Sequence, residues 1–121
     1  MFKIQELLQQ VNKDGRRLDR RMAYSQVVRY RLNKGPFQRA KLEDVSGGGL
    51  RLTVPRYVPK GAKVQVLYNQ PLCSRQHWVE GRVTWSREVE SQYATGVEID
   101  FQSDFDELPF RNMLEQLATT A

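Results

Sequence analysis

The spacing of hydrophobic residues changes along the chain. Near the N-terminus, apolar residues recur at i, i+3, i+4 and i+7, namely at Ile4, Leu7, Leu8 and Val11. This spacing predicts an amphipathic helix over residues 2–12. From residue 23 onward, apolar and polar residues alternate with a period of two, which indicates strands. The pattern predicts three segments: an N-terminal amphipathic helix in residues 1–14, an arginine-rich linker over 15–22, and a β-rich body over 23–121.

The β-rich body contains six segments with strand-like alternation, separated by turn-forming residues: 24–32, 37–45, 50–54, 62–68, 77–85 and 95–101. Short strands at this spacing favour a closed or nearly closed antiparallel barrel, because closure removes exposed sheet edges. After the last strand, residues 103–118 return to helical spacing, with apolar positions at Phe110, Met113, Leu114 and Leu117. We expect a C-terminal helix with Pro109 in its first turn, capping one barrel opening. The predicted fold is therefore mainly β, with a six-stranded antiparallel barrel between two helices.

Length and composition narrow the class of protein. A chain of 121 residues fits one domain, and no apolar run is long enough to span a membrane. The N-terminus lacks the apolar region of a secretory signal, so we expect a cytoplasmic protein. The single cysteine, Cys73, cannot form an internal disulfide framework.

Enzymatic chemistry has little support in the sequence. His77 is the single histidine, and no cysteine or carboxylate stands at metal-ligand spacing from it. No serine lies in a G-x-S-x-G motif. The acidic residues Asp104, Asp106 and Glu107 stand where a helix N-terminus favours negative charge. The sequence therefore predicts no catalytic residues, no metal and no cofactor.

The charge of the chain favours an anionic partner. The formal net charge is +5, and 13 of the 19 basic residues are arginines. The planar guanidinium forms bidentate hydrogen bonds with phosphate and guanine and stacks on aromatic rings. Charge alone does not select among a nucleic acid, a membrane surface and a small nucleotide.

Two short motifs flank the first predicted hairpin. In "RRLDRR", Arg17 and Arg21 are four residues apart, as are Arg16 and Arg20. In "DVSGGG", Asp44, Ser46 and Gly49 form a D-x-S-x-x-G pattern. A solvated charge run and an ordinary turn would explain each motif separately. However, three consecutive glycines exceed what a turn requires, which suggests that another group approaches this backbone closely.

With "GRVTW" and "GVEIDF" following in order, the chain resembles the PilZ domain family over about residues 15–118. These small bacterial β-barrels bind the second messenger cyclic di-GMP. The resemblance implies a PilZ-like barrel and a nucleotide site. The implied binding residues are Arg17 and Arg21 for guanine edges and phosphates, Asp44 for guanine donors, Ser46 for a phosphate or a base, and Gly47, Gly48 and Gly49 as side-chain-free backbone.

Two further residues extend the implied site. In PilZ domains, an arginine directly before the R-x-x-x-R motif accompanies binding of two stacked ligands, so Arg16 predicts two cyclic di-GMP molecules per chain. Trp85 is a candidate for stacking on a guanine. It also alternates in phase with Val79 and Val83, so a core position is the alternative.

The resemblance implies a receptor or adaptor that changes conformation when cyclic di-GMP binds and then signals to a protein effector. The effector could act in motility, in exopolysaccharide production or as an enzyme. Two alternatives remain open. One is a small basic β-barrel that binds nucleic acid, although no DNA partner is expected. The other is a PilZ-type adaptor that works through protein contacts without nucleotide.

Overall fold

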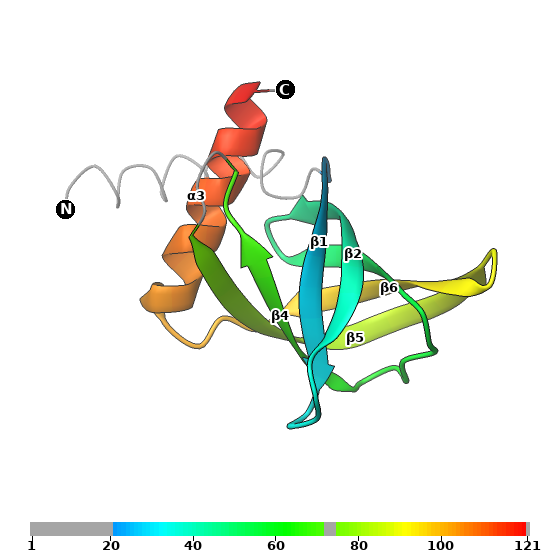
Figure 1. Ribbon diagram of the computed structural model, residues 1–121. Coiled ribbons are helices and arrows are strands. Elements are labelled where there is room, and N and C mark those ends of the chain that lie inside the picture. Colours follow the sequence, from blue (N-terminus) through cyan, green and yellow to red (C-terminus); the bar gives the residue numbers. More distant parts are fainter. Residues whose placement is uncertain (1–20, 72–74, 121) are drawn as a thin grey trace.

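The computed structural model describes residues 21–71 and 75–120 (Figure 1). The predicted six-stranded antiparallel barrel and the C-terminal helix are confirmed. The elements are β1 (Met22–Leu32), β2 (Gln38–Ser46), β3 (Gly49–Val54), β4 (Lys63–Asn69), β5 (Gln76–Val89), β6 (Gln92–Ile99) and α3 (Asp104–Thr120). The helix predicted over residues 2–12 lies outside the described residues.

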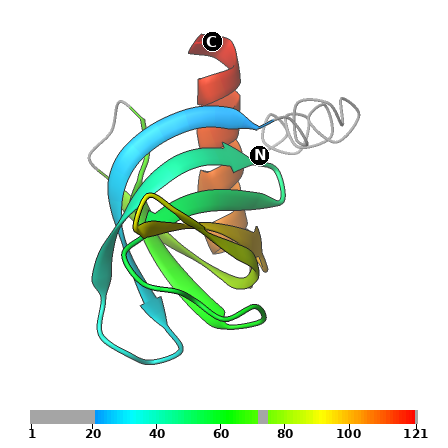
Figure 2. The same cartoon turned by 90° about the vertical axis from the view of Figure 1, so that its right-hand side faces the viewer.

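Every barrel strand has two hydrogen-bonded neighbours. The order around the barrel is β1-β2-β3-β6-β5-β4, and β4 returns to β1 through pairs such as Arg29 with Leu67 (Figure 2). The inward positions of the alternating pattern fill the interior, and residues such as Leu42, Val66 and Val79 are almost completely buried. Alternation therefore predicted the core correctly, because closure buries one face of every strand.

The hairpin of β5 and β6 is longer than predicted. The predicted strands ended at residue 85 and began again at 95, whereas β5 reaches Val89 and β6 begins at Gln92. The two-residue turn uses Glu90 and Ser91, whose φ angles are 50° and 69°. The hairpin tip projects from the barrel (Figure 1), and there residues such as Arg87 and Glu88 are exposed. Alternating hydrophobicity cannot mark strands that are exposed on both faces.

The start of α3 is fixed by hydrogen bonds at Ser103. The backbone N–H of Phe105 donates to Ser103 Oγ over 3.2 Å, and the N–H of Ser103 donates to Asp106 Oδ1 over 2.9 Å. This reciprocal pattern is a capping box. Pro109 lies five residues after Asp104, in the second turn, so its predicted place in the first turn was wrong. The serine cap, rather than the proline, sets where the helix begins.

The C-terminal helix completes the core. Phe110, Met113 and Leu114 are buried, as their spacing predicted, and they join the barrel's hydrophobic cluster. The Phe110 ring lies 5.8 Å from the ring centroid of Tyr68 and 5.6 Å from that of Phe101. The helix contacts β1 and β5, the strands on either side of β4 (Figure 1).

Stability should decrease at high pH because of Tyr68. Its hydroxyl is buried without a hydrogen-bond partner among the described residues. Burial raises the Tyr68 pKa above its ordinary value of 10.0, and the charge of Asp106 raises it further. Below pH 10 the Tyr68 phenol is neutral in the folded and in the unfolded state. Above pH 10 the unfolded chain ionises first, so the free energy of unfolding falls by up to about 1.4 kcal/mol per pH unit.

Urea denaturation at several alkaline pH values tests this expectation. Tyr68→Phe should make the decline shallower, whereas Tyr57→Phe, at a side chain that is 58% exposed, should leave it unchanged. An identical decline in wild type and Tyr68→Phe would contradict the assigned role of the Tyr68 hydroxyl.

Candidate functional site

The candidate site is a row of residues that crosses four strands. Asp44 of β2 pairs with Arg51 of β3, Arg51 pairs with Gly96 of β6, and Gly96 pairs with Trp85 of β5. Residues directly opposite on neighbouring strands lie about 5 Å apart and share one face of the sheet. The row begins beside Ala23 of β1, which pairs with Asp44. The sheet therefore places Asp44, Arg51 and Trp85 on one continuous surface, close to the start of the described chain.

Two arginines bind the Asp44 carboxylate. Arg21 Nη1 lies 2.6 Å from Oδ1, and Arg51 Nε lies 2.8 Å from Oδ2. Asp44 is 8% exposed, while the arginine side chains are 48% and 40% exposed. The carboxylate is therefore satisfied on both oxygens, and each guanidinium keeps N–H donors directed toward solvent.

The sequence predicted Arg21 and Asp44 but missed Arg51. The turn after β2 contains two residues, Gly47 and Gly48, so that Ser46 pairs with Gly49 and Asp44 with Arg51. Assuming a two-residue turn at these glycines would have placed Arg51 beside Asp44. The missed signal was therefore the register of the hairpin.

A β-bulge turns Asp44 outward. Leu42 pairs with Leu52, and the next pair is Asp44 with Arg51, so Glu43 is an extra residue in β2. Without it, strict alternation would place Asp44 on the same side as the buried Leu42. The bulge shifts the phase and lets the carboxylate face the arginines outside the barrel.

A second bulge decides the position of Trp85. Val83 pairs with Val97 and Trp85 pairs with Gly96, so Thr84 is an extra residue in β5. Trp85 is consequently partly buried and outside the core cluster, although it alternates in phase with Val83 in the sequence. Its indole lies over Gly96, in the space that a Cβ there would occupy, and Arg87 Cζ is 5.9 Å from its ring centroid. The alternative of a core position for Trp85 was wrong.

The three consecutive glycines occupy different environments. An ideal Cβ at Gly49 would lie 2.5 Å from the carbonyl oxygen of Val97, so β6 itself requires a glycine there. Gly48 is exposed, and a Cβ there would have no atom within 4 Å, while Gly47 is buried. Ser46 Oγ donates to the carbonyl oxygen of Gly49 over 3.4 Å, a long contact that leaves the hydroxyl available. The close neighbour that the sequence suggested is therefore strand β6 at Gly49. The carbonyl oxygen of Gly48 accepts from the N–H of Ile99 over 2.9 Å, whereas the space that a Cβ of Gly48 would occupy is open.

The other predicted binding residues, Arg16 and Arg17, lie outside the described residues. Within residues 21–71 and 75–120, no group of three or more histidine, cysteine or acidic side chains is placed to hold a metal ion. In the same residues, no helix is long and apolar enough to cross a membrane.

Comparison with known proteins identifies the family and the fold. The PilZ domain model matches residues 15–118. No curated protein matches the chain. Similar solved structures include the PilZ domain of CeSA from a cellulose-synthesizing bacterium, with a TM-score of 0.57 and 14% identity, covering 84% of this chain and 98% of that one.

Two larger proteins also share the fold. A tetrameric PilZ protein from Xanthomonas campestris has a TM-score of 0.56 and 16% identity over 73% of this chain, which spans 49% of that one. The Borreliella burgdorferi protein PlzA, solved in complex with c-di-GMP, has a TM-score of 0.57 and 10% identity over 94% of this chain and 57% of its own. At these identities the likeness shows the fold alone, but the family model matches most of the sequence. The chain belongs to the PilZ domain family.

Proposed function

We propose that this protein is a cytoplasmic receptor for cyclic di-GMP that signals to a protein effector. PilZ domains are ligand-binding receptors rather than enzymes. The observation that most supports the proposal is the Asp44 carboxylate held between Arg21 and Arg51, on the hairpin whose turn contains Gly48. This arrangement offers hydrogen-bond donors and an acceptor on one surface, and a turn without side chains follows along the same hairpin.

The chemistry of the ligand matches these groups. Each guanine of cyclic di-GMP accepts hydrogen bonds at O6 and N7, which suit an arginine, and donates from N1 and N2, which suit a carboxylate. We assign Arg17 and Arg21 to guanine edges and phosphates, and Asp44 to guanine donors. Ser46 would bond a phosphate or a base. Gly48, between Gly47 and Gly49, would let a ring or a phosphate approach the main chain.

Binding would rearrange the arginine that precedes β1. In the described state both oxygens of Asp44 already accept from arginines. For a guanine to donate to Asp44, Arg21 has to yield or share Oδ1, whereas Arg51 can keep Oδ2. Because Arg21 belongs to the proposed switch linker over 15–22, ligand contacts made there would reposition the segment 1–14 relative to the barrel over 23–121. The differential affinity of the ligand for the two arrangements sets the extent of switching.

We further propose that two stacked cyclic di-GMP molecules bind per chain. Two intercalated ligands carry four phosphate charges and expose an additional guanine face. Arg16, directly before the R-x-x-x-R motif, supplies a further guanidinium for that face. Trp85, on the outer surface beside Arg87, offers an indole on which a guanine could stack.

Tryptophan fluorescence tests binding at this surface. In a Trp78→Phe variant, Trp85 is the single remaining tryptophan. We expect cyclic di-GMP to quench its emission to a saturating value, because a stacked guanine contacts the indole. GTP at the same concentration should leave the emission unchanged. Equal responses to the two nucleotides, or no response to either one, would contradict the proposed site.

A further inference from the structure

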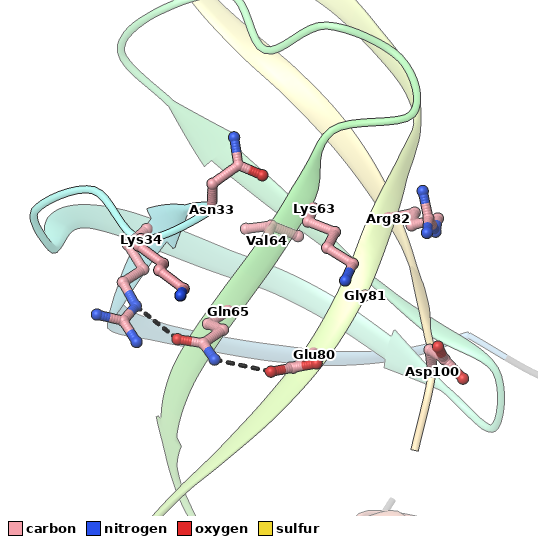
Figure 3. A pocket seen from close by; sticks show the side chains of 10 residues that line it. Asn33, Lys34, Lys63, Val64, Gln65, Glu80, Gly81, Arg82 and Asp100 are labelled. Atoms are coloured by element: carbon pink, nitrogen blue, oxygen red, sulfur yellow. Dashed lines mark hydrogen bonds between the residues drawn. The ribbon is translucent and has the colours of Figure 1, made fainter. Parts of the chain in front are cut away.

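A second polar hollow lies on the outer face of β1, β4 and β5, away from Asp44. Its volume is about 270 Å³, and we call it the β1–β4–β5 pocket (Figure 3). Its charged lining residues are four cations, Arg31, Lys34, Lys63 and Arg82, and two carboxylates, Glu80 and Asp100. The charged lining is therefore predominantly basic.

Two of the cations stand opposite each other on neighbouring strands. Lys63 of β4 pairs directly with Arg82 of β5, and both side chains are exposed. Like charges in this position destabilise a sheet. Glu98 lies opposite Arg82 on the other side, in β6, but no ion pair joins Glu98 to Arg82 among the described residues. Lys34, Lys63 and Arg82 make no ion pair with any described residue, so the local repulsion would be relieved by an anion from outside.

The fourth cation is held in place. Arg31 Nε donates to Gln65 Oε1 over 2.5 Å. Gln65 Nε2 in turn donates to Glu80 Oε1 over 2.8 Å (Figure 3). The guanidinium carbon of Arg31 also lies 4.7 Å from the ring centroid of Phe37. An arginine fixed by a neighbour and by a ring loses less conformational entropy when it binds a carboxylate.

The shape and lining of the pocket narrow the class of ligand. Small-molecule sites usually enclose about 300–1,000 Å³, so this pocket is at the small end for a ligand bound as a whole. A nucleic-acid backbone would meet repulsion from Glu80 and Asp100, and among the residues that the structure describes no aromatic side chain lines the pocket to stack with a base. A peptide with acidic side chains suits it better, because its carboxylates can face the cations while its backbone N–H groups face Glu80 and Asp100.

We infer that the β1–β4–β5 pocket docks an acidic segment of a partner protein. At the pocket β4 is paired on both sides, since Val64 lies opposite Leu32 of β1 and Gly81 of β5, so the segment cannot bind there by adding a strand to the sheet. Recognition therefore depends on ion pairs from the carboxylates of the segment to Lys63, Arg82 and Arg31. The inference does not depend on nucleotide binding, because the pocket uses none of the residues assigned to cyclic di-GMP.

The test is a titration of the ¹⁵N-labelled full chain with a short glutamate-rich peptide in the absence of cyclic di-GMP, followed by NMR. We expect the largest shifts at the amides of Gln65, Lys63 and Arg82. Lys63→Glu should lower the affinity for the peptide at least about fivefold. Lys60→Glu makes the same charge change at an exposed residue outside the pocket lining and should weaken it less than about twofold.

Three results would overturn the inference. The first is that the peptide shifts residues elsewhere, or none at all. The second is that Lys60→Glu weakens binding as much as Lys63→Glu, which would indicate attraction by net charge alone. The third is that an oligothymidylate binds the same residues more tightly than the peptide, which would assign the pocket to nucleic acid. None of these results bears on cyclic di-GMP, so failure here is distinguishable from failure of the proposed function.

Discussion

Replacing Arg21 by alanine should weaken the binding of cyclic di-GMP by about 1–3 kcal/mol, roughly 5- to 150-fold in affinity, while the barrel stays folded. The loss is expected because bidentate donation from a guanidinium to guanine cannot be replaced by a methyl group. The fold should survive because Arg21 is largely exposed and Arg51 still binds Asp44 Oδ2. The pair joins a half-exposed guanidinium to a carboxylate that is only 8% exposed, so we expect its loss to lower the free energy of unfolding by about 1–3 kcal/mol without unfolding the barrel. Isothermal titration calorimetry and urea denaturation measure the two quantities.

The matched control for Arg21→Ala is Arg29→Ala. Arg29 is an exposed arginine of β1 that stands opposite Arg39 rather than Asp44, so its removal takes away the same charge without touching the candidate site. We expect its affinity for cyclic di-GMP to stay near that of the wild type. If both variants lose affinity equally, the effect is one of net charge, and the assignment of Arg21 to the ligand is wrong.

Gly49→Ala should destabilise the barrel by about 1–3 kcal/mol. The added Cβ would lie 2.5 Å from the carbonyl oxygen of Val97, a backbone atom that can move only if β3 and β6 separate. Gly48→Ala is the paired control, since a Cβ there has no neighbour within 4 Å. We expect Gly48→Ala to change the free energy of unfolding by less than about 0.5 kcal/mol.

The same pair of variants separates folding from binding. If the ligand approaches the main chain at Gly48, Gly48→Ala should lower the affinity for cyclic di-GMP at least about fivefold, the equivalent of about 1 kcal/mol. Urea denaturation and calorimetry on both variants give the comparison. Wild-type affinity in Gly48→Ala would remove this loop from the site, and wild-type stability in Gly49→Ala would contradict the close approach of β6.

The sequence predicted the barrel because closure buries one face of each strand and leaves the other in water. The sequence-based predictions were wrong where an element does not have one buried face and one face in water. Beyond Trp85, the β5–β6 hairpin projects from the barrel, and its two-residue turn carries Glu90 and Ser91 rather than glycine. Pro109 is compatible with several positions near a helix start, and a side-chain hydrogen bond at Ser103 decided between them.

The candidate site was predicted in part for a related reason. Motif spacing identified Asp44 and Arg21, and the structure joins them in an ion pair. Arg51 lies opposite Asp44 because of the register between β2 and β3, and motif spacing in the sequence does not specify that register. Trp85 faces outward because of a bulge at Thr84, and one extra residue reverses every inference drawn from alternation. Fold prediction tolerates such a local shift, whereas site prediction does not.

Whether this chain binds cyclic di-GMP is measured by isothermal titration calorimetry of the purified, folded chain, with GTP as the control ligand. We expect saturable binding of cyclic di-GMP at micromolar concentrations with about two molecules per chain, and no heat of binding for GTP. A stoichiometry near one would remove only the second, stacked ligand assigned to Arg16. If circular dichroism shows the chain to be folded and it does not bind cyclic di-GMP, the protein is not a receptor for this nucleotide.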